Sequence, residues 1–173
     1  AFIYARIGVG AGFVVDGQVY RGSGAGAGEI GHMKIIPEGG KPCRCGNTGC
    51  LETLISEPII VELARELALE QPDGILARYL EKGTGSAIER VFAAARQDDR
   101  TTRDMLNDRA GYLGIALANL VSVFNPELIV LGGFLSQGFD LLRPVTESTM
   151  RDRAFANLGE RVRLRTTSFG SQA

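Results

Sequence analysis

Residues 28–52 read GEIGHMKIIPEGGKPCRCGNTGCLE and contain the single histidine and all three cysteines of the chain, which are His32, Cys43, Cys45 and Cys50. A structural zinc ion takes four nitrogen or sulfur ligands in a tetrahedron, and three cysteines with one histidine are a standard set. Gly46 and Gly49 let the backbone fold the sulfurs around one centre. Lys41 and Arg44 lie beside the cysteines and favour their thiolate forms. The stretch therefore predicts a structural Zn²⁺ site.

The same four residues could instead be core residues or free thiols, but a random distribution along the chain would rarely group them so closely. A nucleic-acid-binding zinc finger is not expected, because the spacing differs from that class and no basic recognition helix follows. Four protein ligands leave no open coordination position, so a catalytic zinc is not expected either.

Composition narrows the class of protein. The length of 173 residues suits one domain, and 45% hydrophobic residues can form a sizeable core. The net charge of −1 gives no electrostatic case for nucleic acid or an anionic membrane. We find no signal peptide at residues 1–15 and no apolar run near the ~20 residues of a membrane span. An odd number of cysteines with metal-like spacing favours a reducing compartment, so we expect a cytoplasmic protein.

Residues 2–21, which precede this stretch, predict a three-stranded antiparallel meander. Aromatic and β-branched residues at 2–7 indicate a strand, and Asp16-Gly17 is a pair that favours a tight hairpin turn. We expect Gly8-Val9-Gly10-Ala11-Gly12 to form a glycine loop. Residues 22–28 are glycine-rich and either let the backbone approach a ligand or form a simple flexible connection.

Helical patterns follow the cysteine-rich stretch. Ser56 with Pro58 predicts a helix start, and Ser86 with Glu89 predicts a capping box. Thr102 is the expected cap of the next helix, and Asn125-Pro126 ends it. The expected helices cover residues 56–69, 75–81, 86–95, 103–124 and 138–152, the last of them interrupted or restarted at Pro144.

Two strands complete the pattern. Residues 128–131 form a short apolar run that indicates a strand buried on both faces, ended by Gly132-Gly133. Alternation at residues 161–166 indicates a last strand exposed on one face. Together these elements predict an α/β fold with a mixed sheet.

The helix at 103–124 carries four small residues that allow close packing of another helix, namely Gly111, Gly114, Ala116 and Ala118. Its small-residue face could form part of a homodimer surface, or it could simply pack inside the chain.

The motifs Glu29-Ile30-Gly31-His32 and Cys43-x-Cys45-Gly46-x-x-Gly49-Cys50-x-Glu52 resemble the signature of the ROK family (repressors, open reading frames and sugar kinases). The resemblance runs from Gly8 to about Gly133. It implies an actin-like ATPase, ribonuclease H-like fold, in which residues 1–173 form the C-terminal sugar-binding and zinc lobe. A first lobe, any winged-helix DNA-binding domain and a last helix would then lie outside this sequence, which opens inside a strand without an initiating Met.

The resemblance also implies site residues. Glu29, His32 and Glu52 match the family's contacts to sugar hydroxyls. Ionised carboxylates are strong acceptors for hydroxyl donors, and a histidine that binds zinc through one nitrogen can offer its other N–H. The two glutamates could instead be solvated surface carboxylates or residues that support the metal ligands.

Gly8, Gly10, Gly132 and Gly133 match the family's phosphate and adenosine loops, which predicts a weak or vestigial nucleotide site. Kinases of the family usually carry threonine where this chain has Val9, and Arg6 and Arg21-Gly22 are also more similar to the repressor branch. The catalytic aspartate of the kinases would lie before Ala1, so we assign no catalytic residue in this chain.

Three functions remain open. The preferred one is the sugar-sensing effector-binding and oligomerisation domain of a ROK-type transcriptional regulator, with DNA bound only through an N-terminal domain outside this sequence. The alternative is the C-terminal lobe of an ATP-dependent sugar kinase similar to glucokinases or N-acetylhexosamine kinases. The third is a zinc-stabilised interaction domain without a ligand. The expected partners are a sugar or sugar derivative and further copies of the chain, in a homodimer or higher oligomer, and no membrane.

Overall fold

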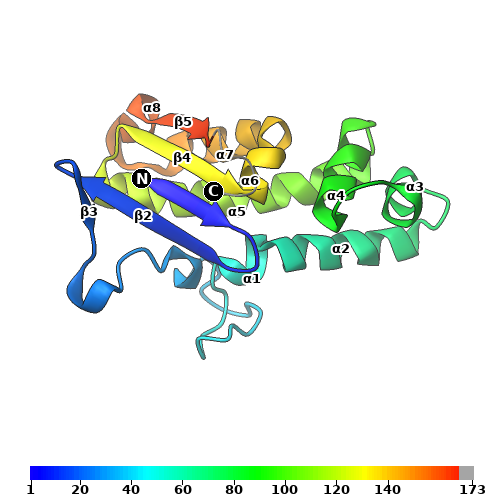
Figure 1. The fold of residues 1–173 in the computed structure, drawn as a ribbon, viewed down its shortest axis with the longest axis horizontal. Helices are drawn as coiled ribbons and strands as arrows, with labels where there is room; N and C mark the ends of the chain where they lie inside the picture. Colours follow the sequence, from blue (N-terminus) through cyan, green and yellow to red (C-terminus); the bar gives the residue numbers. More distant parts are fainter. Residues whose placement is uncertain (168–173) are drawn as a thin grey trace.

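The computed structural model describes residues 1–167, in which a mixed sheet is the central element (Figure 1). Its strand order is β3-β2-β1-β4-β5. The first three strands pair antiparallel, whereas β4 and β5 run parallel to β1. Their bounds are β1 Phe2–Ala5, β2 Val9–Val15, β3 Gln18–Tyr20, β4 Leu128–Gly133 and β5 Arg163–Thr166. The predicted α/β class with an initial antiparallel meander is confirmed.

The hairpin between β2 and β3 turns where the sequence predicts it. Asp16 and Gly17 both adopt positive φ, at 51° and 76°, as a tight hairpin turn of the primed type requires. The expected glycine loop at 8–12 is wrong, because β2 already begins at Val9. Gly10 and Gly12 lie within this strand, in register with Tyr4 and Phe2 of β1. Pairing across the antiparallel ladder thus outweighs the weak strand preference of glycine.

The described residues form eight α-helices, which are the five predicted ones and three four-residue helices that the sequence did not predict. They are α1 Glu52–Ile55, α2 Glu57–Glu70, α3 Ile75–Lys82, α4 Ala87–Arg96, α5 Arg100–Phe124, α6 Phe134–Gln137, α7 Phe139–Arg153 and α8 Leu158–Arg161. Short 3₁₀ turns span Ser23–Ala25, Ile30–His32 and Phe155–Asn157. The helices α2, α3 and α4 pack together beside one end of α5 (Figure 1).

Two predicted helix boundaries need correction. The cap of α5 is Asp99, whose Oδ1 accepts from the backbone N–H of Thr102 at 2.9 Å, so Thr102 is a buried residue inside the helix. Helix α7 continues through Pro144 without a break. Proline removes one intrahelical hydrogen bond, but packing of α7 along α5 supplies stability that propensity alone does not. The capping box of Ser86 and Glu89 is confirmed.

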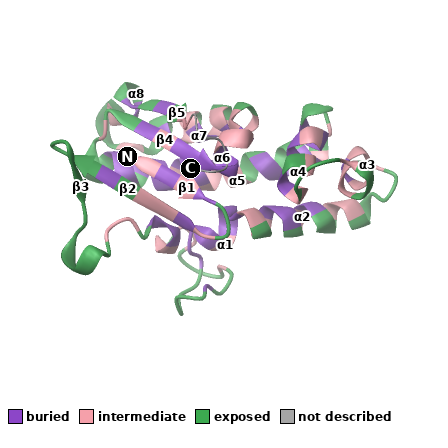
Figure 2. Ribbon diagram, viewed as in Figure 1, coloured by how far each residue is buried: buried purple, intermediate pink, exposed green. Residues whose placement is uncertain are grey.

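The core lies between the sheet and helix α5. Buried residues of the sheet and of α5, coloured purple in Figure 2, belong to one hydrophobic cluster. The sheet contributes Ile3, Ala5, Ile129, Leu131 and Leu164, and α5 contributes Leu113, Leu117 and Val121. On the opposite face, Phe2, Tyr4 and Val130 are only half-buried. The prediction that the 128–131 strand is buried on both faces is therefore wrong for these residues.

Helices α5 and α7 approach closely at Gly114. A Cβ atom there would lie 2.5 Å from Cβ of Thr149 and 2.9 Å from the carbonyl oxygen of Thr146. At Gly111, by contrast, an added Cβ would meet nothing within 4 Å. Ala116 and Ala118 are also buried. Part of the small-residue face thus packs within the chain, as one of the two interpretations expects.

Candidate metal centre and binding cavity

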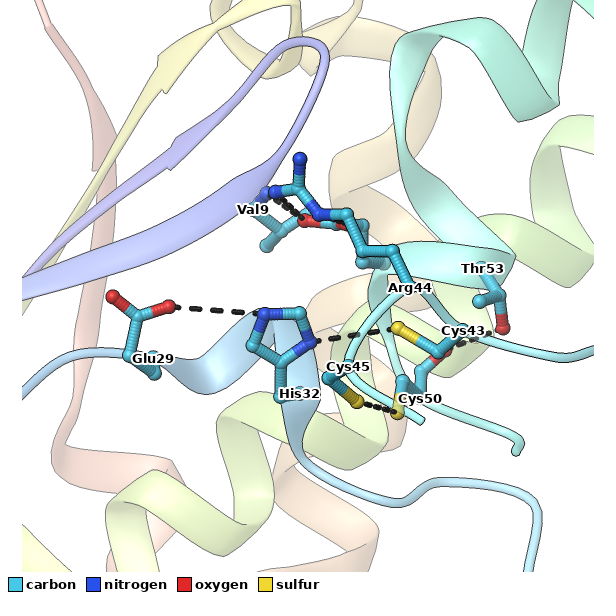
Figure 3. Close-up of polar contacts among 9 residues, drawn as sticks. Val9, Glu29, His32, Cys43, Arg44, Cys45, Cys50 and Thr53 are labelled. Atoms are coloured by element: carbon cyan, nitrogen blue, oxygen red, sulfur yellow. Dashed lines mark hydrogen bonds and ion pairs between the residues drawn. The ribbon is translucent and has the colours of Figure 1, made fainter. Parts of the chain in front are cut away.

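The four predicted metal ligands converge in the structure (Figure 3). The Nδ1 atom of His32 lies 3.5 Å from Sγ of Cys43, and Sγ of Cys45 lies 3.7 Å from Sγ of Cys50. All four candidate ligand atoms lie within 4.8 Å of one another. Tetrahedral zinc, with Zn–S near 2.3 Å, separates two sulfurs by about 3.8 Å and sulfur from nitrogen by about 3.6 Å. The cluster therefore has the composition and the dimensions to hold a metal ion such as zinc.

Close backbone contacts bring the ligands together. His32 ends the 3₁₀ turn Ile30–His32, where a Cβ on Gly31 would lie 2.3 Å from the carbonyl oxygen of Val9. Gly49 adopts φ of +71°, and a Cβ there would lie 2.1 Å from the carbonyl oxygen of Ile36. Only glycine fits either position, because any side chain would collide with backbone. The two glycines hold the turn that carries His32 and the loop that carries the cysteines in place.

Residues 43–47, which carry the first two cysteines, form a compact turn that we call the knuckle. The N–H of Cys43 donates to the carbonyl of Asn47 at 2.8 Å, and the N–H of Gly46 donates to the carbonyl of Cys43 at 3.0 Å. Gly46 has φ of +91°, which suits glycine. After the last ligand, the fully buried Leu51 joins the loop to α1 and the core. Leu51 thus ties the cluster to the hydrophobic core after Cys50, as the buried Ile30 does before His32.

The thiols at the cluster differ in acidity. A hydrogen bond from the backbone of Asn47 lowers the pKa of Cys45 to about 7, whereas burial raises the pKa of Cys50 to about 12. Cys50 therefore carries a proton at neutral pH when no cation is present. A metal binds thiolates, so binding must release this proton, and metal affinity must decrease in acid.

A cavity of about 380 Å³ opens next to the cluster. It is lined by Tyr4, Arg6, Ile7, Gly8, Val9, Gly10, Glu29, Arg44 and Glu52. Two of the three predicted sugar contacts, Glu29 and Glu52, thus line one cavity from different segments. The Glu29 side chain is 72% exposed, whereas that of Glu52 is 11% exposed. The cavity combines two carboxylates, two guanidinium groups and a glycine turn.

Glu52 is held by three contacts. Its Oε2 accepts from the backbone N–H of Val9 at 3.1 Å. Arg44 forms an ion pair with the same carboxylate, with Nε 3.0 Å from Oε1 and Nη2 3.4 Å from Oε2. The residue begins α1, which places its carboxylate at the favourable N-terminal end of a short helix. These contacts fix the carboxylate towards the cavity.

His32 lies between the cluster and Glu29. Its Nδ1 faces Cys43, and its Nε2 lies 3.9 Å from Oε2 of Glu29 (Figure 3). The ring itself lines a second cavity of about 630 Å³, which Glu29 shares and to which Phe13 and Phe124 contribute. The three predicted sugar contacts are therefore adjacent, although His32 does not line the same cavity as Glu52.

The predicted nucleotide-loop glycines fall into two groups. Gly8 and Gly10 line the 380 Å³ cavity. Gly132 and Gly133 end β4, where a Cβ would lie 2.6 Å from the Phe2 ring and 2.1 Å from the carbonyl of Ala5, respectively. Close packing alone accounts for these last two glycines. A nucleotide role for any of the four stays a prediction.

The valine at position 9, where kinases of the family usually carry threonine, is weaker evidence against a kinase than the sequence suggested. Its side chain is 5% exposed and belongs to the core, while its backbone N–H contacts Glu52. The absence of a side-chain hydroxyl was expected to remove a phosphate contact. Because this side chain packs into the core, its identity says less about phosphoryl transfer than the sequence suggested.

Arg44 is the site residue that the sequence interpretation missed, since it was assigned only an influence on the thiolates. The pattern Cys-x-Cys carried a usable signal. When both cysteines face one centre, the residue between them is free to face elsewhere, and here it turns to Glu52.

The chain matches the ROK family model over residues 1–173, and it belongs to that family. It is 43% identical over 141 residues to a glucokinase of Halalkalibacterium halodurans, a match that covers 81% of this chain and 43% of that protein. It is 34% identical over 164 residues to the DNA-binding transcriptional repressor Mlc of Escherichia coli, covering 95% of this chain and 39% of that protein.

The structural comparison gives the same family. The crystal structure of a ROK family glucokinase from Streptomyces griseus, in complex with glucose and AMPPNP, matches with a TM-score of 0.83 and 27% identity. The match covers 99% of this chain and 56% of that chain. The expected actin-like fold is confirmed. The chain spans about two fifths of the length of the curated relatives it matches.

None of the helices within residues 1–167 combines the length and the hydropathy needed to cross a bilayer.

Proposed function

We propose that this chain is the sugar-binding part of a ROK protein and that its 380 Å³ cavity holds the sugar. The observation that carries the proposal is the convergence of Glu29 and Glu52 on that cavity beside the His32 and cysteine cluster. A sugar presents several hydroxyls, each of which donates and accepts, and ionised carboxylates are strong acceptors for them. The cavity is small enough to enclose a single sugar unit.

In this proposal Glu52 is the fixed acceptor and Glu29 the adjustable one, because their exposures differ so strongly. His32, Cys43, Cys45 and Cys50 would hold a structural zinc ion, which supplies a fixed tautomer and orientation for the His32 ring. With Nδ1 turned to the cluster, Nε2–H is the donor that faces Glu29. The geometry thus supports His32 as a link between the metal site and the sugar site.

We propose further that the protein containing this chain is a transcriptional regulator whose DNA binding responds to the sugar. Similarity to the repressor Mlc over 95% of the chain supports this role. A sugar alters DNA binding only if it binds two arrangements of the protein with different affinity. The arrangements in this proposal are those of a homodimer or higher oligomer.

A sugar kinase is the second candidate, and a specific observation favours it. Identity to the glucokinase of Halalkalibacterium halodurans reaches 43%, although over a smaller share of the chain. Gly8 and Gly10 line the cavity and could place backbone N–H groups near a phosphate. Arg6 adds a guanidinium at the same cavity.

One experiment separates these functions in the intact protein. Hexoses, pentoses and N-acetylhexosamines are tested for a rise in melting temperature and, with ATP, for phosphorylation. We expect one sugar to raise the melting temperature without turnover and then to change affinity for operator DNA. Turnover would establish the kinase instead. The absence of any thermal shift and any turnover would leave only the zinc-stabilised interaction domain.

A further inference from the structure

Arg44 covers the carboxylate of Glu52, which is held more firmly than that of Glu29. Its side chain is 70% exposed, while that of Glu52 beneath it is 11% exposed, and both line the 380 Å³ cavity. The guanidinium meets the carboxylate through Nε and Nη2, one towards each oxygen. A ligand that reaches the Glu52 carboxylate from this cavity would therefore lie beside Arg44.

The Arg44–Glu52 pair has more unused hydrogen-bond donors than unused acceptors. A carboxylate has about four acceptor positions. At Glu52, Oε2 accepts hydrogen bonds from the N–H of Val9 and from Nη2 of Arg44, while Oε1 forms the ion pair with Nε of Arg44. A guanidinium has five N–H donors, of which two face Glu52. The other three have no hydrogen-bond or ion-pair partner among residues 1–167. The pair thus offers a ligand more donors than acceptors, whereas Glu52 alone would offer acceptors only.

The position of Arg44 is set by its neighbours on both sides. Cys43 and Cys45 turn their sulfurs to the cluster, which leaves the intervening side chain on the cavity side. On the side of the Arg44–Glu52 pair away from the cysteines, a Cβ at Gly8 would lie 3.0 Å from Oε2 of Glu52 and 3.3 Å from Nη2 of Arg44. The pair rests against this glycine, which limits the positions available to the guanidinium.

We infer that Arg44 is a sugar-binding residue that determines specificity, because its unused N–H groups donate to a hydroxyl or ring oxygen of the ligand. The inference rests on the proposed sugar site and extends it. The favoured ligand is one that accepts hydrogen bonds from Arg44 and donates one to Glu52. An Arg–carboxylate pair used in this way recognises the geometry of neighbouring hydroxyls rather than a net charge.

The test is a panel of deoxy sugars, each lacking one hydroxyl of the sugar that the intact protein binds. Affinities are measured by calorimetry for wild type and for Arg44→Ala. We expect the variant to bind the parent sugar about tenfold more weakly, as the loss of one charge-assisted hydrogen bond predicts. In wild type, removing a hydroxyl that Arg44 contacts should weaken binding. We expect this loss of affinity to disappear for at least one deoxy sugar in the variant. Lys41→Ala is the matched control, since Lys41 is a basic residue of the same loop that does not line the cavity.

The outcomes distinguish a failure of the proposed sugar-binding function from a failure of the inference about Arg44 alone. If wild type binds no sugar, the proposed function and this inference are both wrong. If wild type binds sugar and every deoxy penalty persists in Arg44→Ala, the inference alone is overturned. Metal content and melting temperature check that the variant is folded. Should Arg44→Ala not fold, Arg44→Lys keeps the charge but not the planar fork, and an unchanged panel in that variant would equally overturn the inference.

Discussion

At the scale of single residues, the carboxylate of Glu52 is held most firmly of the two acidic groups in the cavity. We expect Glu52→Gln in the intact protein to weaken sugar binding by about tenfold or more, since hydrogen bonds to charged groups contribute about 1.5–3 kcal/mol. Metal content should not change, because Glu52 is not a cluster ligand. Calorimetry of sugar binding and metal analysis check this pair of results, and an unaltered affinity would remove Glu52 from the site.

Gly8 lies against the Arg44–Glu52 pair, and its replacement tests how tightly that pair is packed. A Cβ would approach Oε2 of Glu52 to 3.0 Å, so we expect Gly8→Ala to shift the pair by a few tenths of an ångström and to weaken sugar binding. The control is Gly12→Ala in the strand β2 that follows Gly8, where an added Cβ meets nothing within 4 Å. Equal sugar affinities for the two variants would contradict the close packing.

The ion pair between Arg96 and Asp140, which lies where α4, α6 and α7 meet, makes the stability of the fold depend on pH. Arg96 binds Asp140 through two hydrogen bonds and lowers the pKa of that carboxyl below its usual value. Because the folded-state pKa is lowered, this contribution to stability is complete above the usual pKa and is lost as pH falls through the folded value. The pair is well exposed, so we expect Asp140→Asn to cost no more than about 1 kcal/mol at neutral pH.

Denaturant unfolding of wild type and Asp140→Asn at several pH values measures this effect. The difference in unfolding free energy should shrink in acid, below the pKa of the folded state. A difference that grows as pH falls would contradict the assignment of the lowered pKa to Asp140.

At the scale of elements, two glycines on α5 form a matched pair. We expect Gly114→Ala to destabilise the fold by about 1–3 kcal/mol, because the new methyl group collides with α7 at Thr149. Gly111→Ala should instead stabilise it by up to about 1 kcal/mol, since the methyl meets open space and alanine favours the helix. Thermal or denaturant unfolding of both variants decides the matter, and changes of equal sign would contradict this contact.

Sequence patterns predicted the elements better than their ends. The Ser86 capping box and the Asp16-Gly17 turn follow from local chemistry, which a sequence displays directly. Asp99 was not recognised as the α5 cap because both Asp99 and Thr102 are good N-cap residues, and only the fold selects between them. Val130 is half-buried because burial of a strand depends on which layers cover it, which periodicity does not reveal.

In the candidate site, too, some features follow from the local sequence and others depend on the fold. The four cluster residues could be named from residue type and spacing alone, and the structure brings them together. The pairing of Arg44 with Glu52 could not be predicted, because it depends on how the knuckle is placed against α1 and the Gly8 turn.

At the scale of the whole molecule, the metal loop and the core are joined through Leu51 and α1. Metal binding contributes on the order of 10 kcal/mol when the unfolded chain has no site. We therefore expect Cys45→Ser to lose the metal and to lower the melting temperature markedly. Thr48→Ala is the control, because Thr48 is an exposed residue of the same loop that is not a ligand. Stoichiometric zinc and an unchanged melting temperature in Cys45→Ser would refute the metal site.

The placement of Arg44 between Cys43 and Cys45 also bears on how such a protein can diversify. The two flanking cysteines fix the backbone at position 44, while the side chain at that position faces the cavity. If Arg44 contacts the sugar as we propose, one substitution there would change what the cavity selects and leave the metal ligands in place. Position 44 would then be a place where related proteins acquire different sugar preferences by point mutation, and where a designer changes selectivity without rebuilding the loop.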